Sequence, residues 1–113
     1  MEREILNEGI IVFHLKGSLN HSSYDQVKKN LKEEFEASRF HLILDFTEVN
    51  LVSSLVIGSL FTHHQLLKAH KGTMILCACT PAVREILASL ALDEAFILAE
   101  DLDQALEMVG SKN

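Results

Sequence analysis

The sequence has little of several residue types that mark particular classes of protein. It contains no tryptophan, one proline, two cysteines and five glycines in 113 residues. Two cysteines are too few for the disulfide framework of a small secreted domain, and no proline- or glycine-rich stretch is present to serve as a linker. We therefore expect a single domain over residues 1–113, long enough to bury one core without disulfides or metal.

Basic residues and long apolar runs are also scarce. Ten Lys and Arg residues stand against 16 Asp and Glu residues, which gives a net charge of -6. A sequence-independent nucleic-acid binder needs a basic face, so no nucleic-acid partner is expected. No stretch approaches the roughly 18 apolar residues of a membrane span. Because residues 1–4 also lack the layout of a secretory signal, we expect a cytoplasmic protein.

Apolar patterning alternates between strand and helix along the chain. Strands are predicted at residues 10–16, 41–46, 73–79 and 95–98, with a preceding short strand joined to the first by a turn at residues 7–9. Helices are predicted after them, starting at a capping box on Ser23, at Ser53 or Ser54 after a turn at residues 47–50, at Thr80, and at Asp101. This order predicts an α/β fold with a mixed, largely parallel sheet of about five strands covered by about four helices.

Cysteine and histidine offer two places to look for chemistry. Cys77 and Cys79 fall in one predicted strand, where alternation places both on the same face and too close along the backbone for an ordinary disulfide. They are interpreted as buried free thiols. His63, His64 and His70 share a helix, but their spacing does not match the i, i+4 pair of a helical zinc site. No metal, cofactor or catalytic residue is therefore expected.

The pair Ser53-Ser54 opens the central helix directly after a buried strand. Free backbone N–H groups and the positive end of the helix dipole favour an anion there, including a phosphoryl group on a serine. The alternative interpretation is that one serine simply caps the helix.

Residues 42–58, Leu-Ile-Leu-Asp-Phe-Thr-Glu-Val-Asn-Leu-Val-Ser-Ser-Leu-Val-Ile-Gly, make the motif more specific. They resemble the signature of the STAS domain of anti-sigma factor antagonists, in which a buried strand leads to Asp-Ser-Ser/Ala-Gly-Leu-Gly at the start of the second helix. Residues 17–20, Gly-Ser-Leu-Asn, are similar to the family's Gly-x-Leu/Ile-Asp before the first helix. Residues 81–87 and 92–106 resemble its third helix and closing segment, so the resemblance spans nearly the whole chain.

The resemblance implies a STAS fold and a non-enzymatic switch protein. Family members bind an anti-sigma factor, often a serine kinase of the GHKL type, and thereby release a sigma factor. The kinase phosphorylates the serine at the helix start and ends the binding; by position that serine is Ser54, with Ser53 as the alternative. The implied partner-binding residues are Asn20, His21, Ser53, Ser54, Leu55, Val56, Ile57 and Gly58.

This sequence departs from the family pattern at three of those positions. The aspartate before the phosphoserine is Ser53, the glycine two residues beyond it is Val56, and the aspartate before the first helix is Asn20. Two carboxylates are therefore missing from the implied kinase surface. Their absence favours an alternative function, a STAS scaffold or adaptor that is not phosphorylated and serves another signalling or transport complex.

Overall fold

The computed structural model describes residues 2–6 and 9–110 of the chain. Its elements follow the predicted order: β1 (Glu2–Ile5), β2 (Ile10–Leu19), α1 (His21–Glu36), β3 (His41–Val52), α2 (Ser54–Ala69), β4 (Thr73–Cys77), α3 (Pro81–Ser89), β5 (Ile97–Ala99) and α4 (Leu102–Gly110). The predicted hairpin is confirmed as the antiparallel pair β1 and β2. Asn7 and Glu8 of its predicted turn lie outside the described residues.

The strands form one sheet whose spatial order is the same as the chain order, β1-β2-β3-β4-β5. Strands β2 to β5 are parallel neighbours, and only β1 runs antiparallel to the strand beside it. The predicted mixed, largely parallel sheet is thus confirmed. A parallel sheet needs crossover connections, and helices α1, α2 and α3 supply them.

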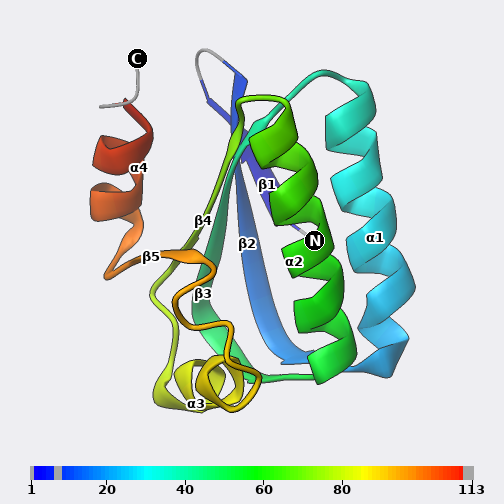
Figure 1. Cartoon of the computed structure of the whole chain (residues 1–113), viewed down its shortest axis with the longest axis vertical. Coiled ribbons are helices and arrows are strands. Elements are labelled where there is room, and N and C mark those ends of the chain that lie inside the picture. The colour runs from blue at the N-terminus through cyan, green and yellow to red at the C-terminus, as the bar shows by residue number, and fades with distance from the viewer. Residues whose placement is uncertain (1, 7–8, 111–113) are drawn as a thin grey trace.

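Apolar side chains on both faces of the central strands make two cores, as buried parallel strands require. The larger core lies under α1, α2 and α3, and the smaller core lies under α4 on the opposite face. Figure 1 shows α1 and α2 side by side on one side of the sheet, with α4 across the sheet from them. Within the described ranges, no helix has the length and apolar character needed to cross a membrane.

The predicted turn at residues 47–50 is wrong, because β3 continues through it to Val52. Strand β2 is long enough to pair with this extension, from Lys16 opposite Glu48 to Leu19 opposite Val52. One register shift lies before this stretch, between His14 and Lys16, and a second lies within it, between Gly17 and Ser18. Strand β4 pairs with β3 only as far as Asp45. The extension therefore places the ends of β2 and β3 together, beyond the end of β4.

The predicted strand at residues 73–79 ends early, at Cys77. The next residue, Ala78, has a left-handed φ of 56° and breaks the strand alternation. Cys77 consequently packs in the core under α4, whereas Cys79 packs in the core under the other helices. The prediction that both thiols share a face is wrong, although both are confirmed as buried and free.

Gly72 lies between the end of α2 and the start of β4, and its role is close packing. Lys71 takes the left-handed conformation at the helix end, with φ 61°. A Cβ atom on Gly72 would lie 2.2 Å from the Phe40 carbonyl oxygen. Glycine is therefore required here by the contact between the end of α2 and the start of β3.

Candidate functional site

The candidate site lies where β2 and β3 end and where α1 and α2 begin. Leu19 and Val52 are paired at the ends of these parallel strands, and the Ser53 N–H donates a 2.8 Å hydrogen bond to the Leu19 carbonyl. The two helices consequently start as neighbours and run in the same direction along the sheet (Figure 1). Their free N–H groups and positive dipole ends meet at one edge of the molecule.

Each of the two helices is capped by the residue that directly follows the preceding strand. Asn20 Oδ1 accepts hydrogen bonds from the Ser22 N–H at 3.0 Å and from the Ser22 hydroxyl at 2.5 Å. Asn20 is therefore the N-cap of α1, and the capping box predicted on Ser23 is wrong by three residues. Asn is among the best N-cap residues, and its extended backbone at φ -105° and ψ -166° suits the position.

The structure gives Ser53 and Ser54 different roles. Ser53 has an extended backbone, and its hydroxyl oxygen accepts a 3.2 Å hydrogen bond from the Val56 N–H, so Ser53 is the N-cap of α2. Ser54 is the first helical residue and is exposed. Among the described residues its hydroxyl makes no hydrogen bond. One serine thus holds the helix and the other presents a free hydroxyl at its positive end.

The implied partner-binding residues divide into an exposed and a buried group. Asn20, His21, Ser54, Leu55 and Gly58 are exposed, and Ser53 is half-buried. Val56 and Ile57 have no exposed surface and pack in the core. A partner that docks on this structure would touch the first group, while Val56 and Ile57 fix the position of α2 beneath it.

One apolar residue at this edge was missed from sequence. Leu51 sits on the β3 extension beside the start of α2, and 57% of its surface is exposed. Its neighbour Val52 packs in the core under α1 and α2, so Leu51 points to the other face of the sheet. Leu55, which is 39% exposed, is the apolar residue next to Ser54. The wrongly predicted turn hid this signal, because alternation along a continued strand places Leu51 and Val52 on opposite faces.

The electrostatics of the edge favour an anion. Neither α1 nor α2 has an acidic residue in its first turn, and both N-caps are uncharged. The positive helix ends are therefore not compensated by side-chain carboxylates there, and a phosphoryl group on Ser54 would be stabilised by both.

The histidines of α2 do not converge on a common point. His63 is buried and packs edge-on against Phe35 of α1, with ring centroids 6.2 Å apart. His64 is buried on another side of the helix, against Phe96, and its Nε2 lies 3.1 Å from the Ala95 carbonyl oxygen. No group of three metal-ligating side chains gathers anywhere in the part of the chain that the structure describes.

The cysteines are poor nucleophiles in this fold. Burial raises the pKa of Cys77 to about 12 and that of Cys79 to about 11. Both thiols are consequently protonated near neutral pH, whereas nucleophilic attack requires a thiolate. Their role in this structure is to pack in the two cores.

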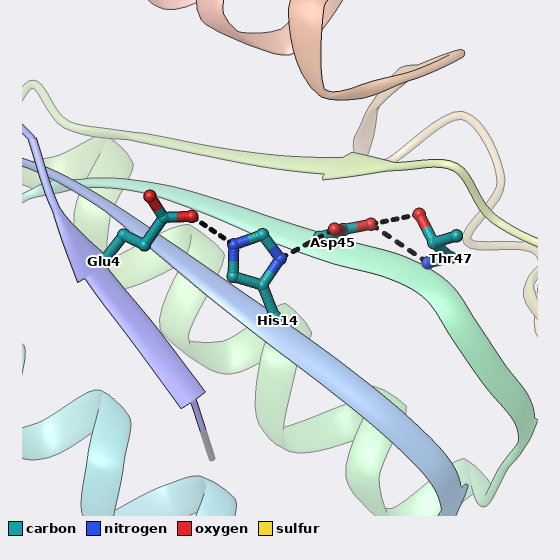
Figure 2. Close-up of polar contacts among 4 residues, drawn as sticks. All are labelled: Glu4, His14, Asp45 and Thr47. Atoms are coloured by element: carbon teal, nitrogen blue, oxygen red, sulfur yellow. Dashed lines mark hydrogen bonds and ion pairs between the residues drawn. The ribbon is translucent and has the colours of Figure 1, made fainter.

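A polar chain on the opposite face of the sheet was also missed from sequence. Figure 2 shows His14 between two carboxylates: Nε2 lies 2.5 Å from Glu4 Oε1, and Nδ1 lies 2.8 Å from Asp45 Oδ2. Asp45 also accepts hydrogen bonds from the N–H and hydroxyl of Thr47, at 3.0 Å and 2.5 Å. These side-chain hydrogen bonds connect β1 to β2 and β3, in addition to the backbone hydrogen bonds of the sheet.

The charges of His14, Glu4 and Asp45 stabilise one another. The hydrogen bond to Glu4 raises the pKa of His14, burial opposes it, and Asp45 adds to the increase. Burial is the largest single effect on Asp45 and acts to raise its pKa, but the bonds from Thr47 and His14 together lower it. Protonated His14 between ionised Glu4 and Asp45 is therefore a stabilising arrangement of the sheet. In the sequence, His14 lies between the apolar Phe13 and Leu15, and this alternation was the available sign that His14 faces the other side of the strand.

Comparisons with known proteins agree on one family. A family model described as "STAS domain" matches residues 5–105. An anti-sigma F factor antagonist of Paenibacillus polymyxa is 23% identical over 82 residues, which cover 72% of this chain and 70% of that protein.

Solved structures show the same fold at low identity. The structure of the anti-sigma factor antagonist SpoIIAA in its unphosphorylated form has a TM-score of 0.85 and 21% identity, and covers 97% of this chain and 96% of that one. A sulfate transporter family protein of Wolinella succinogenes has a TM-score of 0.80 and 15% identity, and covers 96% of this chain and 90% of that one.

Proposed function

Because the chain belongs to the STAS domain family, we propose that it is an anti-sigma factor antagonist switched off by phosphorylation of Ser54. In its unphosphorylated form it binds an anti-sigma factor, a serine kinase of the GHKL type, and so releases a sigma factor. The docking surface consists of Asn20, His21, Ser53, Ser54, Leu55 and Gly58, supported from below by Val56 and Ile57.

The observation that carries the proposal is the free, exposed hydroxyl of Ser54 beside a serine that already caps the helix. A kinase must reach the hydroxyl of its substrate, and Ser54 is exposed with no hydrogen bond to break among the described residues. Ser53 is half-buried, and its hydroxyl oxygen is already engaged by the Val56 N–H at the start of α2. Ser54 is therefore the serine whose hydroxyl a kinase can reach without displacing an existing contact.

Phosphorylation of Ser54 affects docking more than folding. A phosphoserine carries about -1.5 to -2 charges, and the helix start stabilises this charge in the isolated protein. A docked partner would have to cover the same phosphate together with the exposed Leu55, and removing a doubly charged group from water is unfavourable. The modification would thus release the partner while the fold remains intact.

Mass spectrometry after incubation with the cognate kinase and ATP tests this function. We expect the wild-type chain to gain one phosphate and Ser54→Ala to gain none, while Ser54→Ala still binds the kinase. We expect Ser54→Glu to bind the kinase more weakly than wild type by at least about tenfold. Binding would remove the glutamate carboxylate from water without giving it an oppositely charged partner.

Ser53→Asp is the matched control. Aspartate caps a helix as well as serine does, so this variant keeps the α2 start while it removes the second hydroxyl. It should still gain one phosphate. A phosphate that appears on Ser54→Ala and is lost from Ser53→Asp would assign the site to Ser53 and contradict the proposal.

A second function is favoured by the two neutral caps. Asn20 and Ser53 leave the surface without carboxylates that a kinase reading acidic positions would recognise. The chain would then be a STAS scaffold or adaptor in another signalling or transport complex, without phosphorylation. A wild-type chain that binds its partner but gains no phosphate would support this function over the first.

A further inference from the structure

A groove runs between α1 and α2 on the side of these helices away from the sheet. It has a volume of about 200 Å³, and its lining includes Lys28, Lys32 and Phe35 of α1 and Ser59, His63 and Leu66 of α2. Ser54 is not part of it. The groove is thus a feature separate from the proposed docking surface, although α2 contributes to both.

Two polar atoms in the groove have no partner. The Ser59 hydroxyl oxygen and His63 Nε2 are buried and make no hydrogen bond among the described residues. His63 is only 8% exposed. A buried polar group without a partner is unfavourable by about 1–3 kcal/mol, so these two atoms indicate that something polar is missing from the groove.

The rest of the groove is apolar and basic. Leu31 forms its floor, and Phe35 and Leu66 lie toward the ends of both helices that are distant from Ser54. Lys28 and Lys32 line the rim, where the Lys28 ammonium lies 5.0 Å from the centre of the Tyr24 ring. No carboxylate of the described residues lines the groove. Its surface therefore complements a molecule with an apolar body and a negative end.

The order of residues along two parallel helices orients such a molecule. Lys28 and Ser59 lie at the end nearer the helix starts, and Phe35 and Leu66 lie at the other end. Burial lowers the pKa of His63, so its imidazole is neutral near pH 7 and offers Nε2 as a hydrogen-bonding atom between the two ends. A negative head group belongs at the lysine end and an apolar tail at the Phe35 end.

We propose that this groove binds a medium-chain fatty-acid anion. Its carboxylate accepts hydrogen bonds from the Ser59 hydroxyl, from the Nε2–H tautomer of His63 one turn further along α2, and from Lys32, so both unpartnered atoms gain a partner. Its chain covers Leu31, Phe35 and Leu66. The volume suits a short tail, since an engineered apolar cavity of about 150 Å³ accepts benzene. Binding at this groove does not depend on the proposed function at Ser54.

Isothermal titration of the purified protein with sodium octanoate tests the proposal. Octan-1-ol has the chain without the charge, and acetate has the charge without the chain. We expect octanoate to bind with a stoichiometry of one, octanol to bind roughly fivefold more weakly or worse, and acetate not to bind. Equal affinity for octanoate and octanol would overturn the role of the lysines.

Three variants locate the site. Lys32→Gln should weaken octanoate binding by roughly three- to fivefold and leave octanol binding unchanged. Leu66→Glu, which introduces a negative charge at a half-exposed position, should abolish octanoate binding. Lys29→Gln is the matched control, because Lys29 is exposed and adjacent in sequence but does not line the groove, and its affinity should equal that of wild type.

Two results would overturn the proposal outright. One is octanoate binding that Lys29→Gln weakens as much as Lys32→Gln does, which would indicate a nonspecific charge effect. The other is no octanoate binding by the wild-type chain; if that chain also forms a dimer through Leu66, a second copy would be the occupant of the groove. Neither measurement uses a kinase, so failure here is distinguishable from failure of the Ser54 switch.

Discussion

Replacing Ser53 with Ala removes the hydroxyl that accepts a 3.2 Å hydrogen bond from the Val56 N–H at the start of α2. Loss of a serine N-cap destabilises a protein by about 1 kcal/mol. With an unfolding entropy of about 2.1 cal/mol/K per residue over 113 residues, this corresponds to a Tm lower by about 4 °C. Ser54→Ala loses no hydrogen bond within the described chain and gains helix propensity, so its Tm should be unchanged or up to about 2 °C higher.

Thermal unfolding followed by circular dichroism at 222 nm measures both variants, and Ser53→Asp serves as the capping control. The aspartate should restore the Tm to within about 1 °C of wild type, because its carboxylate accepts the same backbone N–H and is favoured by the helix dipole. If Ser54→Ala lost as much stability as Ser53→Ala, or if Ser53→Asp did not recover, the assignment of the two serines would be refuted. The hydroxyl proposed as the phosphorylation site would then be a structural one.

Two further predictions concern the sheet and the end of α2. The pKa of His14 is raised in the fold by Glu4 and Asp45, so its contribution to stability is complete below its unfolded pKa of about 6.5 and is lost as pH rises through the higher folded value. The urea midpoint of wild type should therefore fall more between pH 5.5 and pH 8.5 than that of His14→Gln, and parallel profiles would contradict this. Gly72→Ala should lower the free energy of unfolding by about 1–3 kcal/mol, since the new Cβ would lie 2.2 Å from the Phe40 carbonyl oxygen; an unchanged urea midpoint would show that this contact relaxes freely.

Local signals predicted the parts of the fold that local chemistry determines. Thr80 caps α3 through the Val83 N–H, with Pro81 at the first helical position. Asp101 accepts a hydrogen bond from the Gln104 N–H at the start of α4. In each case the capping residue and its partner lie within one helical turn, so their spacing is visible in the sequence.

The errors arose where distant strands decide the conformation. Residues 47–50 have a turn-like composition, but β2 offers them pairing partners and they remain in a strand. Ser23 was predicted as the N-cap of the first helix, whereas the N-cap is Asn20. Both residue types suit the position, and the choice depends on where β2 ends. His14 and Asp45 are 31 residues apart, and only the register of β2 against β3 brings them together.

For the candidate site, as for the fold, local features were predicted and features that depend on distant strands were not. The position of Ser53-Ser54 at a helix start followed from the sequence, but the identity of the capping serine required the backbone of Ser53, at φ -81° and ψ 156°. The neighbouring α1 start and the exposed Leu51 required the pairing of Leu19 with Val52. Sequence alone located the helix start that is proposed as the site and could not describe the surface around it.

The two borders of the sheet limit how this domain can meet another protein. Strand β5 has only three residues, and β1 is charged at Glu2, Arg3 and Glu4, with Arg3 held by the buried Glu34 of α1 at 2.6 Å. Short or charged border strands resist the addition of a strand from another chain. Recognition by strand addition is thereby disfavoured at both borders, and a protein partner is left to approach through helix ends and helix faces. This also protects a small domain rich in parallel strands from open-ended self-association at high concentration.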